Sequence, residues 1–221
     1  MLKINDLFDL SHTIAGDYLA EFEFPWQALR GIKDLIIMLG KVLDRSEFDE
    51  VTHNVWIHKT ASVATTAFLG APSIIGAETE IRHCAYIRGS ALVGDKCVIG
   101  NSVELKNVIL FDKVQTPHYN YVGDSILGYK SHMGAGSITS NVKSDKSPVT
   151  INTDEKKIET GLKKLGAMLG DYTEIGCNTV LNPGTIIGRK SNIYPLSCVR
   201  GIIPPESIYK SGGVIIKKEN R

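Results

Sequence analysis

Hydrophobic positions repeat with a period of six along most of this chain. An aliphatic side chain occupies every sixth position over a long central stretch, and the same spacing returns near residue 169. These positions are Ile57, Val63, Leu69, Ile75, Ile81, Ile87, Val93, Ile99 and Leu105, and later Leu169, Ile175, Leu181, Ile187, Ile193 and Val199. An amphipathic helix needs a period of 3.6 and a half-buried strand a period of 2. Period six instead suits a short strand plus a turn, three of which form one coil of about 18 residues.

Glycine and the stacking of coils complete this pattern. Glycine follows several of the repeat positions, where a corner needs close packing or a positive φ. Each coil can bury its apolar side only against its neighbours, so many coils are expected in one stack. The period slips by one residue near Leu110 and resumes through Val122, Leu127, Met133 and Thr139.

Residues 1–50 lack the repeat and predict a helical segment. Residues 25–40 read as one helix, because Pro25 suits a first turn and an apolar stripe follows. The stripe consists of Leu29, Ile32, Ile36 and Leu39. We expect this segment to form a cap over the open end of the coils, where it would cover unpaired backbone groups. A docking surface for another subunit is the alternative.

Two further segments depart from the period. Residues 142–168 predict an inserted loop, in which 149–152 and 157–160 flank a turn and form a hairpin. Loops inserted in a rigid scaffold often carry function. Residues 204–221 follow a Pro204-Pro205 break and predict a tail. The predicted organisation is therefore a helical cap over 1–50, coils over 51–203 and a tail over 204–221.

Composition narrows the functional classes. Of 221 residues, 25 are basic and 24 acidic, which gives a net charge of +1. This balance favours neither a nucleic-acid nor a membrane surface as partner. The N-terminus does not read as a signal peptide, and the apolar stretch 35–39 is far too short to span a membrane. The four widely spaced cysteines favour reduced thiols in the cytoplasm.

Three motifs in the central coils give the strongest functional signal. Residues 100–106 read G-N-S-V-E-L-K, residues 118–124 read H-Y-N-Y-V-G-D, and residues 134–141 read G-A-G-S-I-T-S-N. Together they resemble the acetyltransferase domain of the bifunctional N-acetylglucosamine-1-phosphate uridylyltransferase/glucosamine-1-phosphate acetyltransferase family, closely over residues 86–141. The resemblance implies an all-β, left-handed parallel β-helix of hexapeptide repeats, acetyl-CoA as acyl donor, and a homotrimer.

The resemblance also implies roles for individual residues. His118 matches the general base of the family, and a neutral imidazole suits removal of a proton from an attacking amine near pH 7. Glu104 would orient or polarise that imidazole. The backbone N–H of Ala135 matches a group that serves the thioester carbonyl.

The acceptor pocket is implied by a second set of residues. Arg88 lies eighteen positions before Lys106, which is one coil, so both side chains would bind the same phosphate. The guanidinium would donate two hydrogen bonds as a fork, and the ammonium would act as a point charge. Tyr121 and Asn141 match positions that hold the sugar. Lys146 could supply a lysine from the inserted loop.

The chain departs from the family pattern at several positions. His132 stands where the family has an asparagine, and Cys177 where it has a serine. We place His132 in the acceptor site, and Cys177 and Pro195 in the coenzyme groove. These changes leave the acceptor sugar open. No G-x-G-[ST]-R-M loop occurs near the start, so no uridylyltransferase activity is expected.

Three functional hypotheses follow. The leading one is an acetyl-CoA-dependent N-acetyltransferase that acts on an amino-sugar phosphate or a nucleotide-linked amino sugar. A non-catalytic sugar-nucleotide-binding or scaffold protein is the alternative, suggested by His132 and Cys177. A metalloenzyme like the γ-class carbonic anhydrases needs three converging histidines. His83 and His118 lie 35 residues apart without an evident third partner, so no metal site is predicted.

Overall fold

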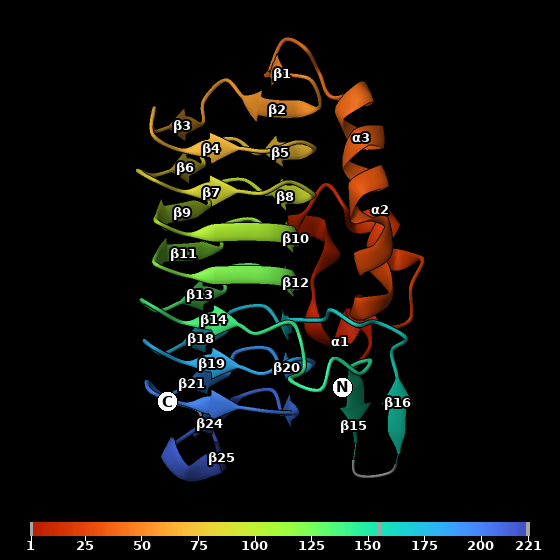
Figure 1. Cartoon of the computed structure of the whole chain (residues 1–221), viewed down its shortest axis with the longest axis vertical. Helices are drawn as coiled ribbons and strands as arrows, with labels where there is room; N and C mark the ends of the chain where they lie inside the picture. Colours follow the sequence, from red (N-terminus) through yellow and green to blue (C-terminus); the bar gives the residue numbers. More distant parts are fainter. Residues whose placement is uncertain (1, 154–155, 220–221) are drawn as a thin grey trace.

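The chain winds into a tall stack of β-coils with helices along one side (Figure 1). The computed structural model describes residues 2–153 and 156–219. Short strands from successive coils pair in parallel, and each coil adds one strand to each of three faces. The fold is a left-handed parallel β-helix, which confirms the predicted fold class.

The three faces are stacks of parallel strands. The first face contains β3 (Ser62–Val63), β6 (Glu80–Ile81), β9 (Val98–Asn101), β11 (Gln115–His118), β13 (His132–Met133), β18 (Glu174–Ile175), β21 (Asn192–Ile193) and β24 (Ser207–Tyr209). The second face contains β4 (Phe68–Leu69), β7 (Tyr86–Ile87), the first halves of β10 (Glu104–Leu110) and β12 (Tyr121–Leu127), β14 (Ile138–Thr139), β19 (Val180–Leu181) and β22 (Cys198–Val199). The third face contains β2 (Val55–His58), β5 (Ser73–Ile75), β8 (Ala91–Val93), the second halves of β10 and β12, β17 (Ala167–Leu169), β20 (Thr185–Ile187) and β23 (Ile202–Ile203).

The slip in the sequence period is a shortened corner. Tyr86 pairs with Glu104, eighteen positions later, whereas Glu104 pairs with Tyr121, only seventeen positions later. The missing residue merges two short strands into one, so β10 and β12 each run for seven residues across the corner between the second and third faces. Asn107 and Asp124 turn these corners with φ values of 55° and 49°.

The repeat positions form the interior of the stack. Ile81, Ile87, Ile99 and Leu105 are at most 1% exposed, as the period predicts. The repeat positions of the first coil are only half-buried, because that coil is stacked on one side alone. They are Ile57, Val63 and Leu69.

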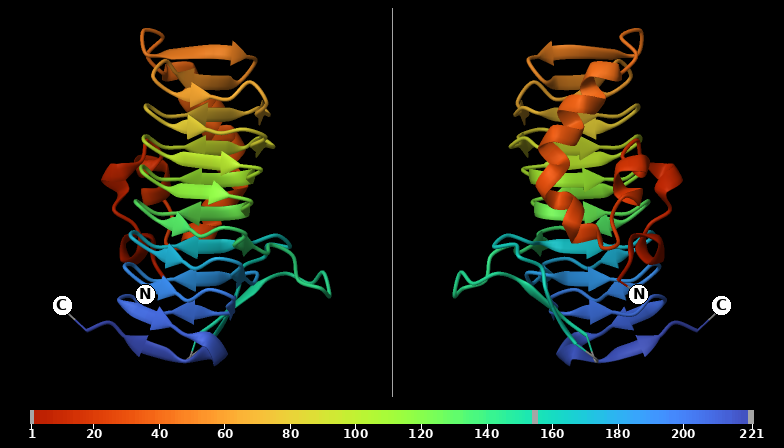
Figure 2. Two further views of the ribbon diagram at one scale, coloured as in Figure 1. Left: turned by 90° about the vertical axis from the view of Figure 1, so that its left-hand side faces the viewer. Right: turned by 90° about the vertical axis from the view of Figure 1, so that its right-hand side faces the viewer.

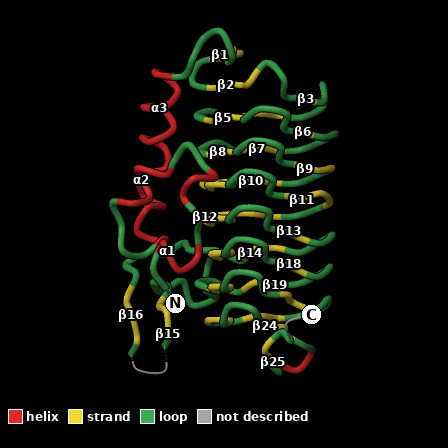
Figure 3. The backbone as a smooth tube through the Cα atoms, turned by 180° about the vertical axis from the view of Figure 1, so that it is seen from behind, coloured by secondary structure: helices red, strands yellow, loops and turns green. Residues whose placement is uncertain are grey.

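The N-terminal segment does not cap the end of the stack, and this part of the prediction is wrong. It consists of α1 (Ile4–Leu7), η1 (Leu10–His12), α2 (Gly16–Ala20), η2 (Pro25–Gly31) and α3 (Ile32–Val42). Helix α3 lies along the third face against β5, β8 and β10 (Figures 2 and 3). The predicted stripe is buried at Leu29, Ile32 and Ile36.

The outer side of the third face explains this placement. Strands alternate inward and outward side chains, and the residues between inward positions are also apolar here: Ile74, Leu92, Ile109 and Ile126, none more than 1% exposed. A face that is apolar on both sides needs cover, and the helices provide it. The end of the stack is covered instead by β1 (Phe48–Thr52), which pairs antiparallel with β2.

The inserted segment forms the predicted hairpin. Strands β15 (Thr150–Asn152) and β16 (Lys157–Glu159) pair antiparallel. Residues 154–155 of its turn lie outside the described residues. The guanidinium of Arg30 donates to the carbonyl oxygen of Gly161 at 2.8 Å, which ties the insertion to the N-terminal segment.

The coils continue past the predicted end at residue 203. Pro204 and Pro205 form a corner, and β24 pairs in parallel with β21 beyond them. The last strand, β25 (Ile215–Lys217), then turns back antiparallel on β24, after a short η3 (Ser211–Gly213). In the described part of the chain, no helix is both long and apolar enough for a membrane span.

Candidate active site

Four predicted residues lie in one column at the corner between the first and second faces. They are His118, Ala135, Cys177 and Pro195, and we call them the His118 column. Backbone hydrogen bonds join successive coils here: the Gly136 N–H donates to the His118 carbonyl at 3.0 Å, and the Asn178 N–H donates to that of Ala135 at 2.8 Å. The structure thus brings the predicted base and the predicted coenzyme residues onto one edge.

His118 is exposed at the end of β11. Its backbone N–H donates to Oδ1 of Asn120 at 3.2 Å, which fixes the turn that follows. The preceding coil approaches closely, because a Cβ added at Gly100 would lie 1.5 Å from the Pro117 carbonyl oxygen. Within residues 2–153 and 156–219, the His118 imidazole has no hydrogen-bond or ion-pair partner. It is therefore free to accept a proton from a bound molecule.

The predicted phosphate residues lie on the adjacent second face. The Arg88 N–H donates to the Leu105 carbonyl at 2.8 Å, so Arg88 stacks directly against Lys106 in the next coil, as predicted. The Arg88 guanidinium donates to Oε1 of Glu104 at 2.8 Å. This hydrogen bond raises the pKa of Arg88 above its ordinary value.

Glu104 does not contact the predicted base. Its carboxylate accepts from Arg88, and no hydrogen bond between Glu104 and His118 occurs among the described residues. Glu104 begins β10 on the second face, whereas His118 ends β11 on the first. The predicted orienting contact is therefore not made in this structure.

Lys106 belongs to a polar network around Asp124. Its Nζ lies 2.8 and 3.0 Å from the two carboxylate oxygens of Asp124, whose side chain is only 5% exposed. Asn107 donates to the same carboxylate at 2.9 Å and Asn141 at 2.6 Å. Asn141 also donates to the Tyr121 hydroxyl at 3.1 Å. The predicted sugar residues and Lys106 are thus held together by a buried carboxylate.

Asp124 and Asn107 were missed as site residues by the sequence analysis. A signal for Asp124 was present, because it is the last residue of the motif at residues 118–124. Burial raises the pKa of the neighbouring Tyr121, so its hydroxyl stays protonated and able to donate.

His132 and Lys146 make no hydrogen bond to the acceptor residues within residues 2–153 and 156–219. His132 begins β13 on the first face, where its Nδ1 lies 2.9 Å from Oε2 of Glu174. It faces Gln115 of the preceding coil and not Tyr121 or Asn141. Its place in the acceptor site stays a prediction. Lys146 is exposed on the inserted loop, with φ of 57° and no ion pair in the described part of the chain.

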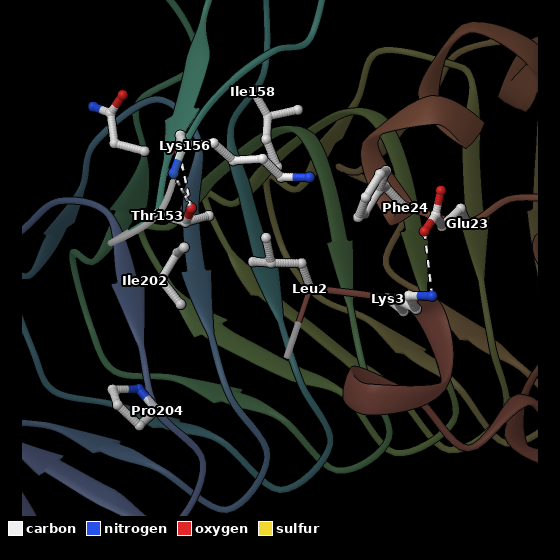
Figure 4. A pocket seen from close by; sticks show the side chains of 10 residues that line it. Leu2, Lys3, Glu23, Phe24, Thr153, Lys156, Ile158, Ile202 and Pro204 are labelled. Carbon is white, nitrogen blue, oxygen red and sulfur yellow. Dashed lines mark hydrogen bonds and ion pairs between the residues drawn. The ribbon is translucent and has the colours of Figure 1, made fainter.

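A cavity of about 650 Å³ lies away from these residues (Figure 4). It opens between the N-terminal segment, the inserted hairpin and the later coils. Its lining includes Leu2, Phe24, Ile158 and Ile202, with Lys3 and Lys156 at the side. None of the predicted site residues lines this cavity.

The remaining histidines and cysteines form no cluster. No group of three His, Cys, Asp or Glu side chains that could hold a metal occurs in residues 2–153 and 156–219. His83 occupies the His118 column two coils earlier, with its Nδ1 2.6 Å from the Thr66 hydroxyl. All four cysteines are free, and Cys97 is buried, which raises the pKa of its thiol.

No protein-family model matches the sequence. Individual relatives do match. The chain is similar to the bifunctional GlmU proteins. It is 31% identical to GlmU of Methanococcus maripaludis strain C5 over 220 residues, covering 98% of this chain and 53% of that protein. It is 38% identical to GlmU of Methanococcus vannielii over 137 residues, covering 62% of this chain and 33% of that protein.

A third relative carries a related name. The bifunctional sugar-1-phosphate nucleotidylyltransferase/acetyltransferase of Sulfurisphaera tokodaii is 31% identical over 203 residues, covering 86% of this chain and 51% of that protein. These relatives confirm the resemblance that the motifs indicate. The chain spans at most about half the length of these three relatives.

Solved structures with the same repeat are more distant. AntD, an N-acyltransferase from Bacillus cereus solved with dTDP and 3-hydroxybutyryl-CoA, matches with a TM-score of 0.42 and 18% identity, covering 84% of this chain and 88% of that chain. The acetyltransferase domain of PglB from Neisseria gonorrhoeae matches with a TM-score of 0.32 and 13% identity, covering 69% and 53%.

Proposed function

We propose that this chain is an acetyl-CoA-dependent N-acetyltransferase. Its acceptor is an amino-sugar phosphate of the glucosamine 1-phosphate type, or a nucleotide-linked amino sugar. The observation that carries this proposal is the His118 imidazole, which has no partner among the described residues, at the corner of the face that also carries the stacked Arg88 and Lys106. The acetyltransferase name of the Sulfurisphaera relative supports the same reaction class.

The second face offers the groups that an amino-sugar phosphate needs. Arg88 and Lys106 supply two cations from adjacent coils, and Tyr121 and Asn141 supply a hydroxyl and an amide for sugar hydroxyls. Both cations are paired with carboxylates in the free chain. A phosphate therefore binds by replacing Glu104 as the partner of Arg88 and by sharing the Lys106 ammonium with Asp124, which favours a dianion over a weaker anion.

The His118 column offers the groups for acyl transfer. The acceptor amine attacks the thioester carbonyl carbon, and His118 takes the proton that the nitrogen loses. The oxygen of the tetrahedral intermediate carries the negative charge, which the Ala135 N–H is suited to stabilise. That N–H has no partner among the described residues. Collapse then releases the coenzyme thiolate, which takes the proton back from His118, and leaves the N-acetylated sugar.

A second copy of the chain would complete the coenzyme groove. The His118 column lies on a convex corner, so one copy provides only one wall. Large apolar side chains project beside it, with Tyr119 64% and Leu196 79% exposed. Exposed apolar groups of this kind mark contact surfaces. We propose a homotrimer in which each groove lies between two copies, and free cysteines fit a reducing cytoplasm.

Thiol release from acetyl-CoA tests the proposal. Glucosamine 1-phosphate and nucleotide-linked amino sugars should each be offered as acceptor, with unphosphorylated glucosamine for comparison. We expect turnover with a phosphorylated amine, and His118→Ala should lower kcat by about 10²–10⁴-fold. His53→Ala is the matched control, because the His53 side chain is 90% exposed and belongs to no predicted site, and it should stay near wild type. If no amine supports turnover but sugar nucleotides bind tightly, the non-catalytic alternative holds instead.

A further inference from the structure

Three lysines stack at a second corner of the β-helix, between the third and first faces. Lys96, Lys113 and Lys130 occupy equivalent positions in successive coils, with φ values of 56°, 61° and 54°. Strands in neighbouring coils lie roughly 4.8 Å apart, so the three positions span roughly 10 Å along the stack. We call them the lysine column. It lies on the side of the first face opposite to His118, because β11 begins near Lys113 and ends at His118.

A cavity of about 530 Å³ opens beside this column. Its lining consists of Lys96, Lys113, Lys130, Gln115, His132 and Glu174. Three ammonium groups and an imidazole therefore face one carboxylate. His132 belongs to this cavity, and its pairing with Glu174 occupies that carboxylate.

Two of the lysines have no acidic partner. Within residues 2–153 and 156–219, neither Lys113 nor Lys130 makes an ion pair. The nearest carboxylates in sequence serve the backbone instead: Asp95 accepts from the Ala77 N–H at 2.7 Å, and Asp112 accepts from the Asp95 N–H at 2.8 Å. Lys96 pairs with Glu78 at 3.4 Å, but both side chains are more than half exposed, so that pair is weak.

Aromatic rings hold the two unpaired ammonium groups. Nζ of Lys113 lies 3.0 Å from the Tyr129 hydroxyl oxygen, and Nζ of Lys130 lies 5.4 and 5.7 Å from the ring centres of Tyr129 and Tyr172. Such contacts attract a cation without neutralising it. Tyr129 itself is fixed, since it stacks on His12 at 3.6 Å between ring centres. The cations are thus preorganised and available.

We propose that the lysine column binds a chain of two or three phosphates, either free or as part of a nucleotide. Its length exceeds what one phosphate group can bridge, and its charges are spaced along a line as a polyphosphate requires. Tyr172, which is 43% exposed beside Lys130, offers a ring on which a nucleotide base can stack. This site is separate from the proposed acyl-transfer site and does not depend on it.

Calorimetric titration of the full-length chain tests this proposal. Tripolyphosphate, pyrophosphate, orthophosphate and ATP are the probes. We expect tripolyphosphate to bind more tightly than orthophosphate and to weaken as salt screens the charges. Lys113→Gln and Lys130→Gln should each weaken tripolyphosphate by about tenfold, since each removes one charge-assisted hydrogen bond.

Lys190→Gln is the matched control. Lys190 occupies the same corner with φ of 57°, but it does not line the cavity. Equal affinity for ATP and tripolyphosphate supports a site for phosphates alone, and tighter ATP binding supports a nucleotide site. The proposal is overturned if tripolyphosphate does not bind at millimolar concentration, if Lys190→Gln weakens it as much as Lys113→Gln, or if ATP binding survives both substitutions. Thermal melting of each variant confirms folding.

Discussion

Two groups of cationic side chains on the same β-helix differ in whether they are paired with carboxylates. Arg88 and Lys106 on the second face are each paired with a carboxylate at 2.8 Å. The ammonium groups of Lys113 and Lys130, at the corner between the third and first faces, contact tyrosines and make no ion pair within residues 2–153 and 156–219. A paired cation must exchange its partner before it binds an anion, which selects for strong anions of the right shape. An unpaired cation attracts any polyanion, and it costs little in folding because it stays in water.

The largest expected effect concerns Lys106. Lys106→Gln leaves the nearly buried Asp124 carboxylate without its cation, so we expect the free energy of unfolding to fall by about 3 kcal/mol. Lys113→Gln, which leaves no carboxylate behind, should stay near wild type. Urea unfolding of both variants measures the difference. If both variants lose the same free energy of unfolding, pairing with a carboxylate does not make a cation more important for stability.

A smaller loss should follow from Asp171→Asn. The Asp171 carboxylate accepts from the Asp9 N–H at 2.8 Å and from the Tyr129 N–H at 2.9 Å, so it joins the N-terminal segment to the tyrosine that supports the lysine column. The side-chain amide of the variant places its NH2 group against one of these backbone N–H groups. We expect the free energy of unfolding to fall by about 2 kcal/mol as a result. Asp145→Asn on the exposed inserted loop is the control. Unchanged urea stability, or unchanged tripolyphosphate affinity, would count against this linkage.

Arg88 should affect acceptor recognition more than stability. Arg88→Gln removes one of two phosphate-binding cations, and we expect kcat/KM for a phosphorylated acceptor to fall by about tenfold. An unphosphorylated amine should lose much less. If both acceptors lose equally, Arg88 does not recognise the phosphate, and the second face is not the acceptor site.

The smallest effect is a pH dependence near the lysine column. Burial raises the pKa of Asp112 above its ordinary value of 3.8. The folded state therefore holds this proton more tightly, so Asp112 contributes stability below about pH 3.8 that is lost as pH rises through the raised pKa. Asp112→Asn removes the carboxyl group and with it this pH-dependent loss of stability. In urea titrations the variant should gain stability relative to wild type as the pH rises above 3.8, and a difference that stays constant with pH would contradict the raised pKa.

Much of the fold could be predicted because the repeat is local. A six-residue period sets each short strand, and a slip of one residue marks the corner where β10 and β12 run on as longer strands. The same coil spacing correctly predicted that Arg88 lies against Lys106. It could not place the helices, because the stripe of Leu29, Ile32 and Ile36 shows that a face is buried but not what it packs against. That information lies in the outward side chains of the third face.

Coil spacing predicts which site residues share a column, but it does not predict contacts between different columns. His118, Ala135, Cys177 and Pro195 share a column because their separations are whole coils plus the insertion. Glu104 accepts a hydrogen bond from Arg88 in this structure, and coil spacing alone does not predict that contact. His132 and Glu174 contact each other across the insertion, so their separation in sequence is not a whole number of coils. The regular coil spacing therefore does not predict this contact.

The reversed strands at the two ends of the stack set a limit on growth. A parallel solenoid presents at each end a coil whose pattern any similar coil could extend, and such edges are templates for fibres. Here β1 and β25 both run against the direction of their neighbours. β1 also carries exposed charges at Asp49 and Glu50. β1 covers the edge of the third face at one end, and β25 covers the edge of the first face at the other. On these two faces an incoming parallel coil would meet a strand of the opposite direction, which disfavours end-to-end addition there.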